Sequence, residues 1–225
     1  MNPQLYVYVD GESHFIRSER CWQRIHGDQA QLELIDSPPN VGSSCYPEEG
    51  SRIRIERRVK FFWDIYFVAG IMEQARHPTV ARAIYFTSMT GGDDLIHEAR
   101  VAIRRHGFEP QVIPELKTLA DQRANLLNSE GVMEKAKGVD IGLAVRMLED
   151  AYMNNYQECL LFTSDVDFLP AIQAVRRMGK RVFVFGYREG LSKTSKLEYE
   201  PDDFVDLEEY MKLHYSLKPQ PPQSG

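Results

Sequence analysis

Residues 160–168 place the strongest constraint on the fold, because an apolar run there ends in two closely spaced carboxylates. The first part of this segment predicts a buried strand, and residues 169–178 have the apolar spacing of a helix. Asp165 and Asp167 therefore fall at a strand-to-helix junction. In a parallel α/β sheet such junctions lie at the carboxyl edge, where ligands usually bind.

Strand and helix patterns alternate along most of the chain. Strands are expected at residues 5–9, 52–56, 81–86, 108–113, 159–162, 181–185 and 204–207. Helices are expected at residues 12–26, 59–75, 95–106, 140–152 and 169–178, with a short one after residue 207. Regular alternation of this kind predicts a right-handed α/β fold around a parallel sheet.

The helix expected at residues 140–152 has an amphipathic pattern, with one apolar and one polar face. The apolar face, which we expect to be buried, holds Ile141, Ala144, Val145, Leu148 and Tyr152. The polar face, which we expect to lie toward solvent, holds Arg146, Glu149 and Asp150.

Chain length and turn-forming residues indicate one domain with an insertion. A chain of 225 residues can bury one full hydrophobic core, and is too short for two ordinary domains to be assumed. Residues 36–51 are rich in turn formers and lack periodicity, which is typical of a surface loop. We therefore expect a single domain over residues 1–215 with an insertion at about 28–60, followed by a disordered tail at 216–225.

Charge and cysteine content limit the classes of partner and compartment. The net charge of −6 and the pI near 5.6 provide no overall basic field, so a nucleic-acid site has to be local. Cys21, Cys45 and Cys159 have no paired spacing and follow no secretory leader, which favours a reducing, cytoplasmic location. The most apolar stretch, at residues 61–72, is shorter than the roughly 20 residues of a spanning helix, so we expect no membrane partner.

Four aspartates lie at the ends of the expected elements. Asp10 follows the strand at 5–9, Asp140 begins a helix, and Asp165 and Asp167 follow the strand at 159–162. Each of them could have a purely structural role: Asp10 could form an Asx-turn before Gly11, and Asp140, Asp165 and Asp167 could be helix caps, since aspartate is among the preferred capping residues. If they meet at one edge of the sheet, their mutual repulsion raises their pKa values unless a cation intervenes.

The ligand types available at such a cluster indicate which cation it would take. Carboxylate oxygens without histidine or cysteine favour Mg²⁺ or Mn²⁺. Metals held in this way activate water and orient a phosphodiester, so hydrolysis of a nucleic-acid backbone is the natural chemistry. A D-x-D pattern after a strand also occurs in nucleotide-sugar transferases and in topoisomerase-type folds, and the residues alone leave these alternatives open.

Four stretches of the sequence occur in an order that resembles one known family. They are LYVYVDGE at 5–12, KAKGVDI at 135–141, TSDVDF at 163–168, and RMGKRV at 177–182 with Phe185-Gly186. From about residue 5 to residue 207 the chain resembles the NYN family of PIN-like, metal-dependent ribonucleases. The resemblance implies a PIN-like three-layer α/β sandwich with a central, mainly parallel sheet. It also implies that Asp10, Asp140, Asp165 and Asp167 form a catalytic, acidic metal cluster.

The combined hypothesis is a ribonuclease that hydrolyses RNA with Mg²⁺ or Mn²⁺. Asp10, Asp140 and Asp165 would bind the metal, while Asp167 would complete the site or orient the attacking water. The RNA, expected to be single-stranded, would be contacted by Ser13, Lys135, Lys137, Thr163 and Ser164.

Two positions depart from the family pattern and keep a second hypothesis open. Family members often have asparagine at the position of Ser13 and glycine at the position of Ser164. The second hypothesis is a non-catalytic RNA- or protein-binding module on the same fold. A homo-oligomer stays open under either hypothesis.

Overall fold

The computed structural model describes residues 4–26, 80–89, 91–114, 138–189, 191–192 and 194–215. Several expected features lie outside these residues. They are the insertion at 28–60, the strand at 52–56, the helix at 59–75 and the tail at 216–225.

The described residues form a six-stranded sheet in the order β3-β2-β1-β4-β5-β6, and every pairing in it is parallel. Its strands are β1 (Leu5–Asp10), β2 (Val80–Met89), β3 (Glu109–Pro114), β4 (Glu158–Phe162), β5 (Arg181–Gly186) and β6 (Asp203–Asp206). The predicted parallel sheet is therefore confirmed, along with each expected strand that falls in the described part of the chain.

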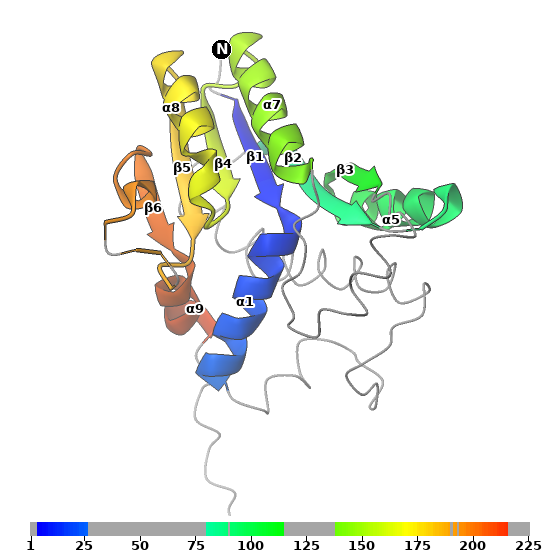
Figure 1. The fold of residues 1–225 in the computed structure, drawn as a ribbon, viewed down its shortest axis with the longest axis horizontal. Helices are drawn as coiled ribbons and strands as arrows, with labels where there is room; N and C mark the ends of the chain where they lie inside the picture. Colours follow the sequence, from blue (N-terminus) through cyan, green and yellow to red (C-terminus); the bar gives the residue numbers. More distant parts are fainter. Residues whose placement is uncertain are drawn as a thin grey trace, which may run out of the picture.

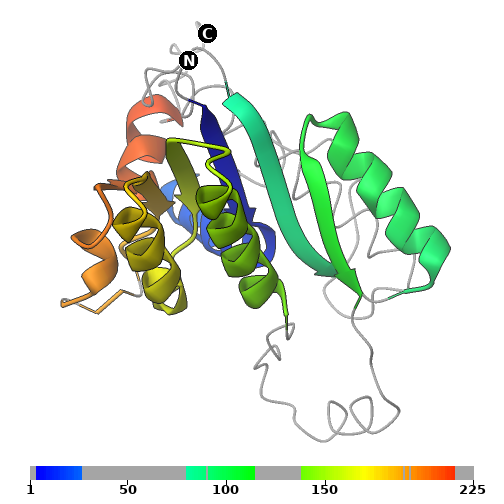
Figure 2. The ribbon, with the colours of Figure 1, turned by 90° about the horizontal axis from the view of Figure 1, so that it is seen from above.

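Helices cover both faces of this sheet (Figures 1 and 2). They are α1 (Gly11–His26), α5 (Asp93–Arg105), α7 (Val139–Tyr152), α8 (Leu169–Arg177) and α9 (Leu207–Tyr215), with short 3-10 turns η3 (Val166–Phe168) and η4 (Lys196–Glu198). Helices α7 and α8 pack on one face, and α1, α5 and α9 pack on the other, which confirms the three-layer sandwich. No helix in the described part of the chain combines the length and apolar character needed to cross a membrane.

Strand β1 lies inside the sheet and is buried on both of its faces. Val7 and Val9 belong to the core under α1, α5 and α9, whereas Tyr6 and Tyr8 belong to the core under α7 and α8. This alternation follows from the two-residue period of a strand. Because both faces are covered, the last residue of the strand, Asp10, is buried as well.

Helix α7 packs on the sheet through a face that only partly matches the one predicted. Its buried residues are Val139, Leu143, Met147, Asp150 and Ala151. Of the face that the sequence pattern placed toward the sheet, Ala144 and Leu148 pack against the core, whereas Ile141, Val145 and Tyr152 are 70%, 46% and 80% exposed. Asp150, which we expected to lie toward solvent, is buried, and the Tyr8 hydroxyl on β1 donates to its Oδ2 at 2.9 Å. A carboxylate with such a partner can be buried.

Gly11 allows the chain to turn from β1 directly into α1. A Cβ atom at this position would lie 2.3 Å from the ring of Tyr85 and 2.7 Å from the carbonyl oxygen of Phe86. The Tyr85 hydroxyl also donates to the Gly11 carbonyl oxygen at 3.2 Å. Strand β2 therefore packs directly against the backbone that follows Asp10.

Substituting Gly11→Ala is expected to destabilise the protein by about 3 kcal/mol, because the added methyl group has to displace a buried ring and a strand carbonyl. Gly142→Ala is the matched control, since its Cβ would meet only the side chain of Ile113, at 3.4 Å, inside helix α7. Alanine is the better helix former, so this control should be neutral or slightly stabilising. Urea denaturation of both variants measures the difference, and equal stabilities would contradict the prediction.

Candidate functional site

The order of the strands creates a switch point between β1 and β4. The chain runs from β1 outward through β2 and β3, and then returns through α7 to β4 on the other side of β1. Connections diverge at this point, and ligands of open α/β sheets bind there, beyond the carboxyl ends of the strands. Asp10 ends β1, and residues 163–167 directly follow β4. Both groups of predicted site residues therefore flank the switch point.

The Asp10 carboxylate is buried and hydrogen-bonded. Only 3% of the residue is exposed. Its Oδ2 accepts a hydrogen bond from the Thr163 hydroxyl at 3.2 Å, and the backbone N–H of Ser13 donates to the same carboxylate. A residue is an N-cap when it lies just before a helix and its side-chain oxygen accepts a hydrogen bond from the backbone N–H three residues later. Asp10, for which we expected an Asx-turn, therefore caps the start of α1.

Neighbouring aspartates and burial raise the pKa of Asp10. Its pKa rises from the ordinary value of 3.8 to about 7, chiefly because the carboxyl group is removed from water. The charge of Asp140 raises it further, and so does that of Asp165, while the bonds from Thr163 and Ser13 partly offset the rise. Three of the four predicted aspartates therefore share one electrostatic environment.

Thr163 connects Asp10 to the loop that carries the other two aspartates. Its fully buried hydroxyl donates to Asp10 and accepts from the backbone N–H of Asp165 at 3.1 Å. Asp165 in turn uses its Oδ1 to accept from the N–H of Asp167 at 3.0 Å and caps the η3 turn. Asp165 is half-buried and Asp167 is exposed.

Asp140 and Asp167 have positions that capping does not explain. The N-cap of α7 is Gly138, with φ of 121°, and Asp140 lies in the first turn of the helix. The N-cap of α8 is Phe168. A carboxylate in the first turn is stabilised by the helix dipole. Capping thus accounts for Asp10 and Asp165, but not for Asp140 and Asp167.

The described carboxylates do not form a ready-made metal site. No three histidine, cysteine, aspartate or glutamate side chains within the described ranges are grouped as ligands of one ion. Asp140 and Asp165 are close enough to raise the pKa of Asp10, yet they are not gathered around a single point.

The residues predicted to contact the substrate differ in how deeply they are buried and in whether the structure describes them. Ser164 is 2% exposed, and its Oγ accepts from the backbone N–H of Tyr187 at 2.7 Å, so it connects the loop after β4 to the end of β5. Ser13 is half-buried in the first turn of α1. Lys135 and Lys137 lie outside the described residues. Contact of these residues with RNA stays a prediction.

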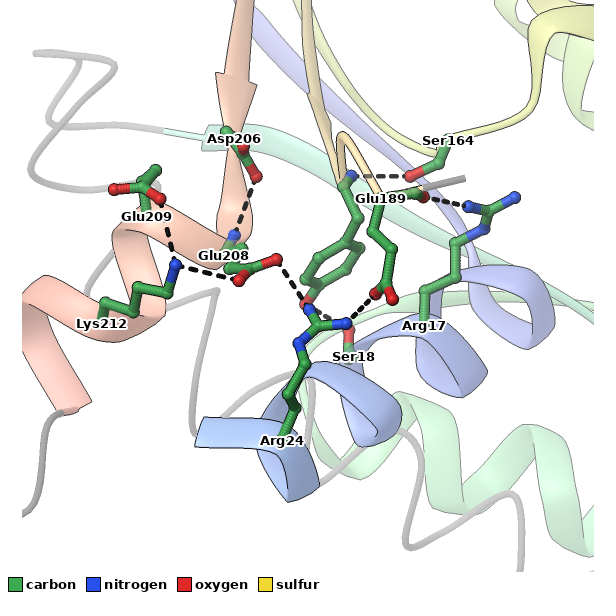
Figure 3. A network of polar contacts seen from close by, with 10 residues as sticks. Arg17, Ser18, Arg24, Ser164, Glu189, Asp206, Glu208, Glu209 and Lys212 are labelled. Atoms are coloured by element: carbon green, nitrogen blue, oxygen red, sulfur yellow. Dashed lines mark hydrogen bonds and ion pairs between the residues drawn. The ribbon is translucent and has the colours of Figure 1, made fainter. Parts of the chain in front are cut away.

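Sequence reasoning missed a buried polar link between this loop and α1. The Tyr187 hydroxyl donates to Ser18 Oγ at 2.8 Å, and Ser18 donates to the His14 carbonyl oxygen at 2.8 Å. Figure 3 shows Ser164 and Ser18 at the two ends of the tyrosine that connects them. Tyr187 directly follows Gly186, the last residue of β5, at the same sheet edge as Asp10, and this position in the sequence is the signal that could have indicated the link.

His14 lies beside this link and is neutral near physiological pH. Its ring packs at 5.6 Å from the ring of Phe162 and at 5.6 Å from the ring of Tyr187. Burial lowers the pKa of His14 to about 3, and the charge of Arg17 contributes to the shift. A ring in this state does not exchange protons near neutral pH, so His14 contributes packing to the site.

Replacing Asp10→Asn is expected to stabilise the metal-free protein at pH 8. The group has a pKa of about 7 when folded and near 3.8 when unfolded, so its stabilising contribution is complete below pH 3.8 and lost as pH rises through 7. Removing the ionised group should therefore raise the free energy of unfolding by about 2 kcal/mol at pH 8 and by progressively less toward pH 4. Urea denaturation at several pH values measures this trend. The exposed Asp203→Asn is the control, and a gain independent of pH would refute the assignment.

Comparison with known proteins places the chain in a family. A sequence model of the NYN domain matches residues 43–208, a range that includes Asp140, Asp165 and Asp167 and begins after Asp10. A crystal structure of a protein of unknown function from Vibrio parahaemolyticus shares the fold, with a TM-score of 0.52 and 16% sequence identity over 91% of this chain and 93% of that chain. No curated protein matches the sequence significantly. Because the family model covers most of its length, the chain belongs to the NYN domain family, within the PIN-like nuclease superfamily.

Proposed function

We propose that the protein is a ribonuclease that hydrolyses RNA phosphodiester bonds with Mg²⁺ or Mn²⁺. The observation that carries the proposal is the buried carboxyl group of Asp10, whose pKa is raised to about 7 by burial and by Asp140 and Asp165. Perturbed groups of this kind concentrate at functional sites. Membership of a family within the PIN-like nucleases supports the same chemistry.

The donor atoms fit a hard divalent cation. Asp10, Asp140, Asp165 and Asp167 offer only carboxylate oxygens, which are ligands that Mg²⁺ and Mn²⁺ prefer. A cation would also remove the repulsion that raises the pKa of Asp10. Since the described carboxylates are not grouped around one point, the side chains of Asp140 and Asp165 would turn toward Asp10 on binding. The bound metal would polarise a phosphate oxygen and lower the pKa of the attacking water.

The chain's own residues would hold and orient the reacting groups. Thr163 and the Ser13 N–H fix the Asp10 carboxylate through their hydrogen bonds. Asp167 is exposed and its backbone N–H is held by Asp165; its side chain would orient the attacking water. We also propose that the phosphates of a single RNA strand are contacted by Ser13, Ser164, Lys135 and Lys137.

A second candidate function is a non-catalytic RNA- or protein-binding module. The observation that favours it is the absence, within the described residues, of three carboxylates grouped as metal ligands. Such a module would bind RNA without a divalent cation and release no product. The two candidates therefore give opposite results in a cleavage assay.

Cleavage of a labelled single-stranded RNA is expected to require Mg²⁺ or Mn²⁺ and to stop on addition of EDTA. Asp10→Asn, Asp140→Asn and Asp165→Asn should each lower kcat at least about 100-fold, because each removes a charge that holds the cation. Asp203→Asn, on the edge strand β6 and separated from β4 by β5, should keep wild-type activity. Undiminished cleavage in EDTA would exclude the proposed metal dependence, and RNA binding without cleavage would favour the second candidate.

Divalent-cation binding is expected to weaken as the pH falls below 7. The cation requires ionised Asp10, and the folded protein binds a proton there with a pKa of about 7. The apparent affinity for Mn²⁺ should therefore fall up to about tenfold per pH unit between pH 7 and pH 5. Calorimetric titration at several pH values measures the slope, which should flatten in Asp10→Asn. An equally steep slope in that variant would assign the proton to another group.

A further inference from the structure

The loop between β4 and η3 is tied to β5 beyond the point where the strand pairing ends. The last paired residues of the two strands are Phe162 and Phe185. After them, the Thr163 N–H donates to the Phe185 carbonyl oxygen at 3.1 Å, and the Tyr187 N–H donates to Ser164 Oγ at 2.7 Å. The Ser164 hydroxyl therefore accepts the hydrogen bond that a backbone carbonyl oxygen would accept if the two strands continued to pair.

Glycine at position 186 permits this close contact. A Cβ atom there would lie 2.4 Å from the Thr163 carbonyl oxygen and 3.0 Å from Ser164 Oγ. The loop that carries Asp165 is therefore pressed against the end of β5.

The side chain of Tyr187 extends this attachment to helix α1. Its hydroxyl donates to Ser18 Oγ at 2.8 Å, two helical turns beyond Asp10, which caps the same helix. Tyr187, Ser18 and Ser164 are all at most 2% exposed. Buried hydrogen bonds of this kind are costly to break, because the separated donor and acceptor cannot form hydrogen bonds with water instead.

Other polar contacts between the side chains of α1 and the chain after β5 are exposed. The Arg17 guanidinium donates to the Glu189 carbonyl oxygen at 3.0 Å, and Arg24 forms ion pairs with Glu189 and Glu208 (Figure 3). Exposed ion pairs contribute little to stability, because water screens them. The buried Tyr187 contacts are therefore the stronger attachment between the loop and the helix.

We propose that Tyr187 is a positioning residue of the candidate site, which holds the loop bearing Asp165 at a fixed separation from Asp10 through Ser164 and Ser18. This inference rests on the proposed function of the site, which it deepens. Ionised carboxylates repel, and the Thr163 hydroxyl is the direct bridge between Asp10 and the loop. Tyr187 supplies a second, independent attachment that opposes the repulsion. The carboxylates are then kept near one another before a cation arrives.

The test compares Tyr187→Phe with Tyr156→Phe. Tyr156 is also buried, and its hydroxyl donates to the Met147 carbonyl oxygen at 2.9 Å on the other face of the sheet. Both variants lose one buried hydroxyl, so they share any general loss of stability. Amide hydrogen exchange of the metal-free proteins, calorimetric Mn²⁺ affinity, and kcat and KM for RNA are measured on both.

In Tyr187→Phe we expect exchange of the Asp165 and Asp167 amides to accelerate about tenfold, because the loop opens more often. Mn²⁺ affinity should fall about tenfold, a typical effect of losing a group that orients metal ligands. The kcat should fall with it, while KM for RNA stays within about twofold, since the substrate contacts remain. Tyr156→Phe should keep wild-type values in all of these measurements.

Two results would overturn the positioning role. One is unchanged exchange at Asp165 and Asp167 in Tyr187→Phe, or an equal change in Tyr156→Phe. The other is faster exchange with wild-type Mn²⁺ affinity and kcat. A wild-type protein that neither binds Mn²⁺ nor cleaves RNA would refute the proposed function instead, and the positioning role toward a metal would fall with it.

Discussion

The burial of a carboxyl group at the end of an interior strand is the constraint on which the rest of the site depends. Strand β1 is covered on both faces, so Asp10 leaves water as the sheet forms. A buried carboxyl group needs hydrogen-bond donors, and the Thr163 hydroxyl and Ser13 N–H supply them. The close approach of β2 then leaves space only for glycine at position 11. The residue types at positions 11 and 163 are therefore suited to the buried end of β1.

A second buried carboxylate, at the opposite end of α7, bonds that helix to the sheet. Asp150 accepts from the Tyr8 hydroxyl at 2.9 Å, from Arg146 Nε at 2.7 Å and from Asn155 Nδ2 at 2.8 Å. Arg146 keeps this charge paired, which offsets the cost of removing it from water. The first turn of α7, with Asp140, lies at the carboxyl edge because α7 is the crossover helix between β3 and the parallel strand β4. The charge of Asp140 is near enough to Asp10 to raise the pKa of that carboxyl group.

Much of this arrangement is predictable from the sequence, because it depends on local periodicity and on element ends. The described strands and helices, the parallel sheet and the common edge of Asp10 and Asp165 all follow from such patterns. The burial of Asp150 on α7 was not predictable, since it depends on a bond between residues 142 positions apart. The bond between Tyr187 and Ser18 spans 169 positions and leaves no local pattern. The identity of the cation, the identity of the substrate and the roles of Lys135 and Lys137 stay predictions.

The strand order also has a consequence for when the site comes into existence during folding. Strands β1, β2 and β3 form one half of the sheet and β4, β5 and β6 the other, and the halves meet only through the pairing of β1 with β4. That pairing joins segments about 150 residues apart, and contacts of such high sequence separation form slowly. Asp10 belongs to the first half and Asp165 follows the first strand of the second half. A chain leaving the ribosome therefore carries separated carboxylates until β4 is made and pairs with β1, and only then do Asp10 and Asp165 come near one another.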